Sequence, residues 1–282
     1  MRCFQKALNS NKLTRVTMIT SKDNSKLRLI RKIVAGDDAE YILLEGVRLA
    51  EELLRSNIEI CDVLYTRRIS ASERGVALLD SLAMKCGAET VAEVQESLLD
   101  RAADSKTAQG IAVIAKRPSA SKGDFEERLA AKKLVIVLHG ITNPANLGAI
   151  LRTVEAAGAD GVVTTRDSTD IFSVKALRAG LGANLRLPVW SGASFDEAAS
   201  WALGNSLVVT AVDAGDGTNY TSLDWKKSRM LVFGSEAHGL SKEELASAAE
   251  RVMIPMKNDV ESLNLSVSCG VILFEALRQR EA

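Results

Sequence analysis

The chain has 282 residues, enough for two domains that each bury a hydrophobic core. Its composition, 46% hydrophobic and 26% charged, is typical of a globular protein. No apolar run reaches the roughly 20 residues needed to cross a bilayer, which argues against a membrane-spanning protein. No apolar signal-peptide core is seen at the N-terminus, so we expect a cytoplasmic protein.

Cysteine spacing and charge distribution narrow the function further. The four cysteines (Cys3, Cys61, Cys86 and Cys269) form no CxxC pair, which argues against a disulfide framework and against a metal site. The formal net charge is zero, yet residues 1–32 contain nine Lys or Arg and one acid, Asp23, a local charge of 9 − 1 = +8. This basic arm favours a surface that contacts nucleic-acid phosphates. A solvated face and a targeting peptide are the alternatives.

The first 117 residues predict an α/β domain. Residues 24–34 have the apolar spacing of a helix, and the apolar run 41–44 predicts a strand. Strand-like and helical segments then alternate up to residue 115, as in α/β domains. The polar segment 117–123, with Pro118 and Gly123, predicts a linker, which we extend over residues 118–130. The second domain is then expected over residues 131–282.

The second domain opens with a continuous apolar run, 134–138, typical of a strand buried in a parallel sheet. After a turn, residues 147–154 carry apolar side chains at helical spacing, with Asn146 as the expected N-cap and Gly158 just past the helix end. Arg152 lies outside that apolar stripe. It is either a functional residue or a surface arginine paired with Glu155, and spacing alone favours the second.

A second polar segment follows the apolar run 230–233. The strand is expected to end at Gly234, where the missing side chain allows a ligand to approach the backbone. Glu236 comes next, at the position where parallel α/β sheets bind ligands. Ser241 and Glu244 have the spacing of a helix capping box. The earlier loop 213–217 is interpreted as a simple turn.

A third segment, 254–270, begins with Ile254-Pro-Met and a polar run over 257–261. Apolar and small residues then alternate over 262–270. The alternation is typical of a strand, whereas the small residues also fit a helix that lies close to a ligand or to another chain. Periodicity leaves both possibilities open.

Together, the segments 143–153, 230–241 and 254–267 resemble, in order, the three signature motifs of the SpoU (TrmH-like) family of RNA ribose 2′-O-methyltransferases, of the SPOUT class. The first domain is similar to the L30e-like substrate-binding domain that precedes the catalytic domain in many of these enzymes. The resemblance implies an α/β catalytic domain whose C-terminal segment forms a deep trefoil knot. It also implies a homodimer with the site at the subunit interface, and a loop followed by a helix over 262–270.

The resemblance also implies S-adenosyl-L-methionine as the cofactor and RNA as the substrate, with no metal. Gly234, Ile254 and Leu263 match the cofactor-binding positions of the family. The matching polar active-site positions are Asn146, Arg152, Glu236, Ser262 and Asn264.

Arg152 is where the family is proposed to have the base that acts on the 2′-hydroxyl. Because a guanidinium group hardly loses its proton, an equally physical role is to hold a phosphate and stabilise the developing alkoxide. The two-domain layout favours ribosomal RNA as the substrate. The same reaction on tRNA, and a non-catalytic RNA-binding or ribosome-assembly protein, are the alternatives.

Overall fold

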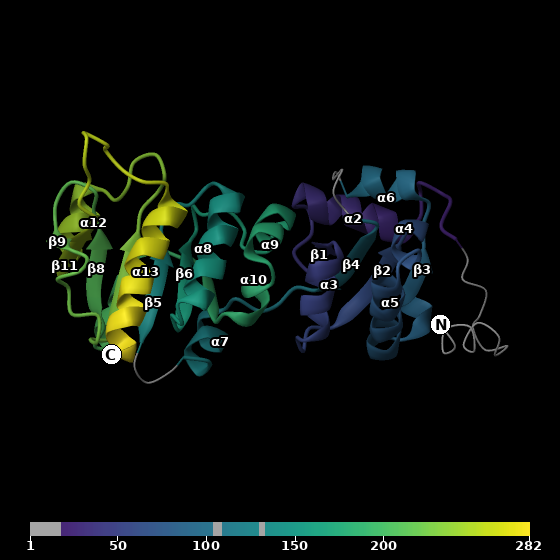
Figure 1. Cartoon of the computed structure of the whole chain (residues 1–282), viewed down its shortest axis with the longest axis horizontal. Helices are drawn as coiled ribbons and strands as arrows, with labels where there is room; N and C mark the ends of the chain where they lie inside the picture. Colours follow the sequence, from purple (N-terminus) through teal and green to yellow (C-terminus); the bar gives the residue numbers. More distant parts are fainter. Residues whose placement is uncertain (1–17, 104–108, 130–132) are drawn as a thin grey trace. The chain divides into compact units, whose positions relative to one another are not determined.

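The computed structural model describes residues 18–103, 109–129 and 133–282. Contacts divide the chain into two compact units (Figure 1). The first comprises Met1–Pro118 and Phe172–Leu185, and the second comprises Ser119–Ile171 and Arg186–Ala282. The N-terminal half of the predicted basic arm, with Cys3, lies outside the described residues. No helix within the described ranges is long and apolar enough to cross a membrane.

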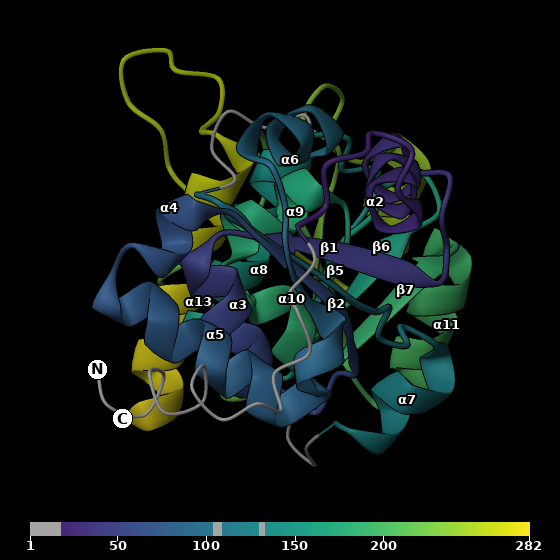
Figure 2. The same ribbon diagram turned by 90° about the vertical axis from the view of Figure 1, so that its right-hand side faces the viewer.

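The first unit is built on a four-stranded sheet of order β1-β4-β2-β3, in which β4 runs antiparallel to both neighbours. Its elements are α2 (Ser25–Ala35), β1 (Tyr41–Glu45), α3 (Val47–Leu54), β2 (Ile60–Tyr65), α4 (Arg67–Ser70), α5 (Glu73–Cys86), η1 (Ala88–Thr90), β3 (Val91–Glu93), α6 (Glu96–Ala102) and β4 (Ile111–Lys116). Successive strand residues face opposite sides, so both faces bury apolar side chains. Helices α2 and α6 cover one face, and α3 and α5 cover the other (Figure 2).

A later segment belongs to this first unit by its contacts. It contains two short helices, α9 (Val174–Gly180) and α10 (Ala183–Arg186). The first ends because Leu181 adopts a left-handed conformation with φ 47°. Val174 packs against the apolar cluster of the first sheet, and Arg178 lies 3.5 Å from Glu45 of β1. Neither contact could be predicted from local spacing.

The predicted linker over residues 118–130 contains a helix. Helix α7 (Lys122–Glu127) is capped by Ser121, and its Phe125 side chain is fully buried in the core of the second unit. Phe125 lies edge-on to Trp201, with ring centroids 5.3 Å apart. Interpreting the whole segment as a polar linker was therefore wrong, because a single aromatic residue creates no periodicity but still buries a large apolar area.

The second unit is built on a seven-stranded sheet of order β7-β6-β5-β10-β8-β11-β9, and every pair of neighbouring strands is parallel. Its remaining elements are β5 (Leu134–Leu138), α8 (Pro144–Ala156), β6 (Gly161–Thr165), β7 (Val189–Ala193), α11 (Phe195–Gly204), β8 (Val208–Val212), β9 (Thr218–Asn219), β10 (Arg229–Phe233), α12 (Lys242–Ser247), β11 (Glu250–Met253) and α13 (Leu265–Glu281). Every residue of β5 and β10 is buried, as predicted for β5 from its continuous apolar run.

Helices α8 and α13 lie side by side in front of this sheet (Figure 1). On the opposite face, α7, α11 and α12 contribute to one apolar cluster. The long loop 254–264 follows β11 and leads into α13 (Figure 1). A loop followed by a helix is therefore confirmed for residues 262–270, and the strand alternative is wrong.

One arginine is completely buried in the second unit. Arg229, the first residue of β10, has an exposed fraction of 0%. Its guanidinium donates to Thr210 Oγ1 at 2.6 Å, to Glu250 Oε2 at 2.7 Å and to the carbonyl of Asp224 at 2.7 Å. The contacts with Thr210 and Glu250 connect three adjacent strands, because β10, β8 and β11 each supply one partner.

Candidate active site

A cavity of ≈ 580 Å³ lies at the carboxyl ends of β8 and β10. This volume is within the roughly 300–1,000 Å³ of small-molecule sites. Three segments form most of its lining: 212–214 after β8, 233–240 after β10, and 262–265 before α13. Strand ends of a parallel sheet are where α/β proteins bind ligands. Asn146 also lines the cavity, so the cavity contains residues of all three motif segments, 143–153, 230–241 and 254–267.

The loop between β10 and α12 folds tightly on itself. The backbones of Ser235 and Gly239 exchange hydrogen bonds, with N···O distances of 3.2 and 2.9 Å. A Cβ atom on Gly234 would stand 2.2 Å from the carbonyl carbon of Gly239. Gly234 is therefore required by the packing of the loop itself, whereas the sequence suggested that it makes room for a ligand. It still lines the cavity.

Glu236 caps the N-terminus of α8. Its carboxylate accepts hydrogen bonds from the backbone N–H groups of Thr142 and Asn143, at 3.3 and 3.4 Å, and from Asn146 Nδ2 at 3.2 Å. A negative charge is favourable at this end of a helix because the helix dipole is positive there. The structure corrects one prediction: the N-cap is Asn143, whose side chain accepts from Ala145 N, and Asn146 lies inside the first turn. The predicted C-terminal glycine, Gly158, is confirmed, with φ 66°.

Asn264 extends this polar chain to the third segment. Its Oδ1 accepts from Ser266 N at 2.9 Å and so caps α13. Its Nδ2 donates to Asn146 Oδ1 at 3.4 Å. Glu236, Asn146 and Asn264 therefore form one line of hydrogen bonds, although they lie on three segments far apart in the sequence. All three residues line the cavity, together with Ser262 and Leu263.

Two of the predicted residues do not line the cavity. Ile254 is half-buried at the start of the loop after β11. Arg152 is exposed on α8, six residues beyond Asn146, or about 9 Å along the helix axis. Its suggested surface partner is already engaged, since Glu155 pairs with Arg186 at 2.5 Å. Among the described residues, no hydrogen bond or ion pair holds the Arg152 side chain.

Two residues near the cavity escaped the sequence interpretation. Asp213, taken there as part of a simple turn, lines the cavity. Its position directly after the buried strand β8 was a usable signal, because ligands collect at such strand ends. Asn143 carried an N-cap signal as well, in front of Pro144, a residue favoured in the first helical turn. Across the described ranges, no three His, Cys, Asp or Glu side chains gather in a group able to bind a metal.

Comparison with known proteins identifies the family. The SpoU rRNA Methylase family profile matches residues 133–274, and the MRM3-like substrate binding domain profile matches residues 28–113. The chain belongs to the SpoU rRNA methylase family. It is thus an RNA methyltransferase of this family preceded by a substrate-binding domain, as the motif resemblance implied.

Relatives of this SpoU protein match over most of its length. An uncharacterized tRNA/rRNA methyltransferase of Mycolicibacterium gilvum is 33% identical over 86% of the chain and 78% of its own length. The mitochondrial rRNA methyltransferase 3A of Danio rerio is 28% identical over 98% of the chain and 70% of its own length.

Solved structures share the fold. An AdoMet-bound rRNA methyltransferase from Sinorhizobium meliloti has a TM-score of 0.79 at 25% identity, covering 94% of this chain and 98% of that one. An RNA 2′-O ribose methyltransferase has a TM-score of 0.79 at 27% identity, covering 94% and 100%. The predicted α/β SPOUT fold is confirmed, and the trefoil knot stays a prediction.

The network around Glu236 yields a first test of this SpoU site. Replacing Glu236 by Ala removes the acceptor of three hydrogen bonds. The three bonds are long, at 3.2–3.4 Å, so we count them together as one good hydrogen bond to a charged group, about 1.5–3 kcal/mol, and expect methyl transfer to fall by roughly 10- to 100-fold. Glu236→Gln keeps one carbonyl acceptor and should lose less. Steady-state transfer rates measure both variants, and equal losses would contradict the capping role.

Proposed function

We propose that the protein transfers a methyl group from S-adenosyl-L-methionine to a ribose 2′-hydroxyl of ribosomal RNA. The observation that carries the proposal is the polar line Glu236–Asn146–Asn264 beside the cavity at the strand ends. One of the two similar structures is an AdoMet-bound rRNA methyltransferase, which supports the cofactor, and the other is an RNA 2′-O ribose methyltransferase, which supports the position of transfer. The name of the zebrafish relative supports ribosomal RNA.

The cavity fits the cofactor in size and in the kind of groups it offers. Leu240, Leu245 and Leu263 provide apolar surface, and the tight loop 235–240 provides backbone polar atoms. Ser262 and Asn264 add polar side chains at one end. S-adenosylmethionine, when bound, supplies a methyl group carried on a positively charged sulfur. In our proposal, Gly234 and Leu263 border it, while Ile254 supports the loop from outside.

The proposed chemistry at the 2′-hydroxyl needs a cation, and Arg152 is the candidate. A hydroxyl that attacks a methyl group becomes more negative as its proton passes to water, so a nearby guanidinium stabilises it electrostatically. The same group can hold an RNA phosphate with two parallel hydrogen bonds. Ser262 and Asn146 are then left to orient the ribose. Arg152 acts in this proposal without itself losing a proton.

Because Arg152 lies outside the cavity of its own chain, we assign it to the site of a second copy. Helix α13 bears an exposed apolar stripe, with Val267 and Phe274 each 50% exposed one above the other at helical spacing. The stripe adjoins α8, because a methyl group added at Gly270 of α13 would stand 3.7 Å from Cγ2 of Thr153 on α8. Thr153 directly follows Arg152, so Arg152 lies near the stripe. A second copy that covers this stripe forms a symmetric dimer and brings Arg152 to its partner.

The first unit is the proposed docking surface for the RNA. Lys22, Arg28, Arg31 and Lys32 are exposed at or near α2, within the basic arm noted in the sequence. Lysine and arginine neutralise phosphates and release condensed counterions, so affinity for RNA is expected to fall steeply with salt. These residues therefore contribute to binding and not to the choice of nucleotide.

The deciding experiment is transfer of labelled methyl from S-adenosylmethionine to unmodified ribosomal RNA and, separately, to tRNA. We expect label on ribosomal RNA, and digestion of the product should locate it on a ribose 2′-oxygen. Label on tRNA alone would favour the alternative substrate, which the name of the Mycolicibacterium relative also includes. Absence of both transfer and cofactor binding would favour a non-catalytic RNA-binding protein.

A further inference from the structure

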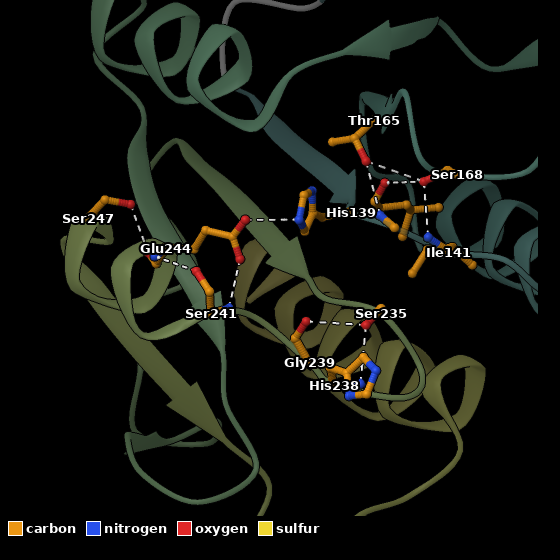
Figure 3. A network of polar contacts seen from close by, with 12 residues as sticks. His139, Ile141, Thr165, Ser168, Ser235, His238, Gly239, Ser241, Glu244 and Ser247 are labelled. Atoms are coloured by element: carbon orange, nitrogen blue, oxygen red, sulfur yellow. Dashed lines mark hydrogen bonds and ion pairs between the residues drawn. The ribbon is translucent and has the colours of Figure 1, made fainter.

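His139 lies directly after β5 and is not part of the cavity lining. Its Nε2 lies 2.9 Å from Oε1 of Glu244, which belongs to α12 (Figure 3). Both side chains are largely buried, with 19% and 21% of their surface exposed. A contact between a ring nitrogen and a carboxylate in such surroundings is stronger than one on an open surface.

Glu244 uses both of its oxygens. Oε2 accepts from the backbone N–H of Ser241 at 2.7 Å, while Glu244 N donates to Ser241 Oγ at 3.2 Å. These two bonds form the capping box predicted from the sequence, and the structure confirms it. The other oxygen is left for His139. The capping box is therefore linked to the end of β5, a strand on the opposite side of β10 from β8.

Helix α12 has few other contacts that hold it. It is six residues long, none of them is fully buried, and Leu245 is its one partly buried apolar residue that packs on the core cluster. A helix this short is unstable on its own, so its position depends on its caps and contacts. Ser241 follows Leu240, the last residue of the cavity loop 235–240. A contact that fixes the capping box therefore also fixes the end of the cavity loop.

The opposite end of this contact is rigid. The His139 backbone N–H donates to the carbonyl of Phe233 at 2.9 Å, and its ring meets that of Phe195 at 74° with centroids 5.6 Å apart. The turn that follows is fixed by Thr165 and Ser168, whose hydroxyls accept from the next two backbone N–H groups, each at 3.0 Å (Figure 3). The ring therefore has little freedom to follow a displaced carboxylate.

The ring also has one preferred tautomer. Its Nδ1 is buried and finds no hydrogen-bond partner within the described part of the chain. A proton placed there would be a buried donor without an acceptor, which costs about 1–3 kcal/mol. The proton of the neutral ring therefore belongs on Nε2, where it is directed at Glu244.

We propose that His139 is a positioning residue for cofactor binding. By donating from Nε2 to Glu244, it keeps the capping box, and with it the cavity loop 235–240, in the conformation that receives the cofactor. The identity of that cofactor rests on the function proposed above. Loss of His139 should weaken cofactor binding, because the cavity loop is then less firmly held. It should leave the transfer step nearly unchanged, because His139 does not line the cavity.

The test compares two substitutions in the full-length protein, His139→Leu and His139→Gln. Leucine removes the donor, whereas the glutamine amide can donate from nearly the same place as Nε2. For Leu we expect the Kd and KM of S-adenosylmethionine to rise about tenfold, as for the loss of one good hydrogen bond, with kcat within about twofold. Gln should restore both constants to within about threefold of wild type. Hydrogen exchange should become faster in residues 235–241 of the Leu variant.

A matched control is provided by another hydrogen-bonded helix cap. Ser72 caps α5 in the first unit, where its hydroxyl accepts from Gly75 N at 3.1 Å, and it lies outside the cavity lining. Ser72→Ala should perturb that helix and leave cofactor affinity and exchange in residues 235–241 unchanged. Unchanged affinity and exchange in His139→Leu would overturn the positioning role, as would equal effects in Ser72→Ala. If the wild-type protein does not bind S-adenosylmethionine, the proposed function fails. The hydrogen-exchange rate of residues 235–241 in His139→Leu then still shows whether His139 holds the cavity loop.

Discussion

Arg152→Ala is expected to abolish methyl transfer while the protein still binds S-adenosylmethionine with an affinity within about twofold of wild type. The physical reason is that Arg152 is exposed, holds no partner among the described residues and lies outside the cavity. Removing one electrostatic stabiliser of a developing negative charge typically costs about 10²–10³ in kcat. Single-turnover transfer and calorimetric binding measure the two quantities. A parallel collapse of cofactor affinity would show that the assigned role is wrong.

Mixing two kinds of impaired subunits tests whether Arg152 serves the other copy. Arg152→Ala subunits keep an intact cavity, and Glu236→Ala subunits keep their arginine. If the arginine acts across the dimer, each mixed dimer has one intact site. Random exchange makes half of the dimers mixed, so mixing should restore about a quarter of wild-type activity. If the activity of the mixture is no higher than the combined activities of the two unmixed variants, Arg152 acts within its own chain.

Arg229→Ala should produce the largest loss of stability. It would leave Thr210, Glu250 and the Asp224 carbonyl without the buried guanidinium that connects them. Breaking a buried ion pair by removing one partner costs about 3–5 kcal/mol in the free energy of unfolding. At about 2–4 °C for each kcal/mol, the melting temperature should fall by roughly 10 °C. Chemical and thermal denaturation followed by circular dichroism would measure both.

Two further variants make the Arg229 result interpretable. Arg229→Met fills most of the vacated volume, and the carboxylate of Glu250, whose side chain is 32% exposed, can still reach water. We therefore expect a smaller loss than for Ala. Arg278→Ala removes an exposed arginine paired with Glu275 on α13, and should change the free energy of unfolding by less than about 1 kcal/mol. An Ala variant at 229 no less stable than this control would contradict the structural role.

Local elements could be predicted from the sequence because their causes are local. The helix predicted over 24–34 is observed as Ser25–Ala35, and the Ser241–Glu244 capping box forms as its spacing indicated. Continuous apolar runs correctly marked the buried strands β5 and β10. In each case the signal is either the spacing of apolar residues or a helix-capping pair. Such a signal lies within one element and does not depend on residues elsewhere in the chain.

The site could not be predicted from local patterns, because its residues come from segments far apart in the sequence. The chain of contacts from Glu236 through Asn146 to Asn264 depends on tertiary proximity, and only the motif resemblance pointed to all three residues. Spacing alone favoured a surface pair of Arg152 with Glu155, but Glu155 pairs with Arg186, which lies 31 positions away. Likewise, Phe125 looked like part of a linker because its burial depends on Trp190 and Trp201. Long-range packing leaves no periodic trace in the segment that it fixes.

The distances along the chain within this site also bear on how the protein is made. Strand β5 pairs with β10, joining Leu134 to Arg229, and the polar line is completed only by Asn264 at the start of α13. Pairing between such remote segments is slow, because long loops must close before their contacts form. A nascent chain that has not yet reached Asn264 has neither the full cavity lining nor the complete hydrogen-bonded line. Activity is therefore expected only after the full chain has folded and, in our proposal, paired with a second copy, with no partly competent intermediate during synthesis.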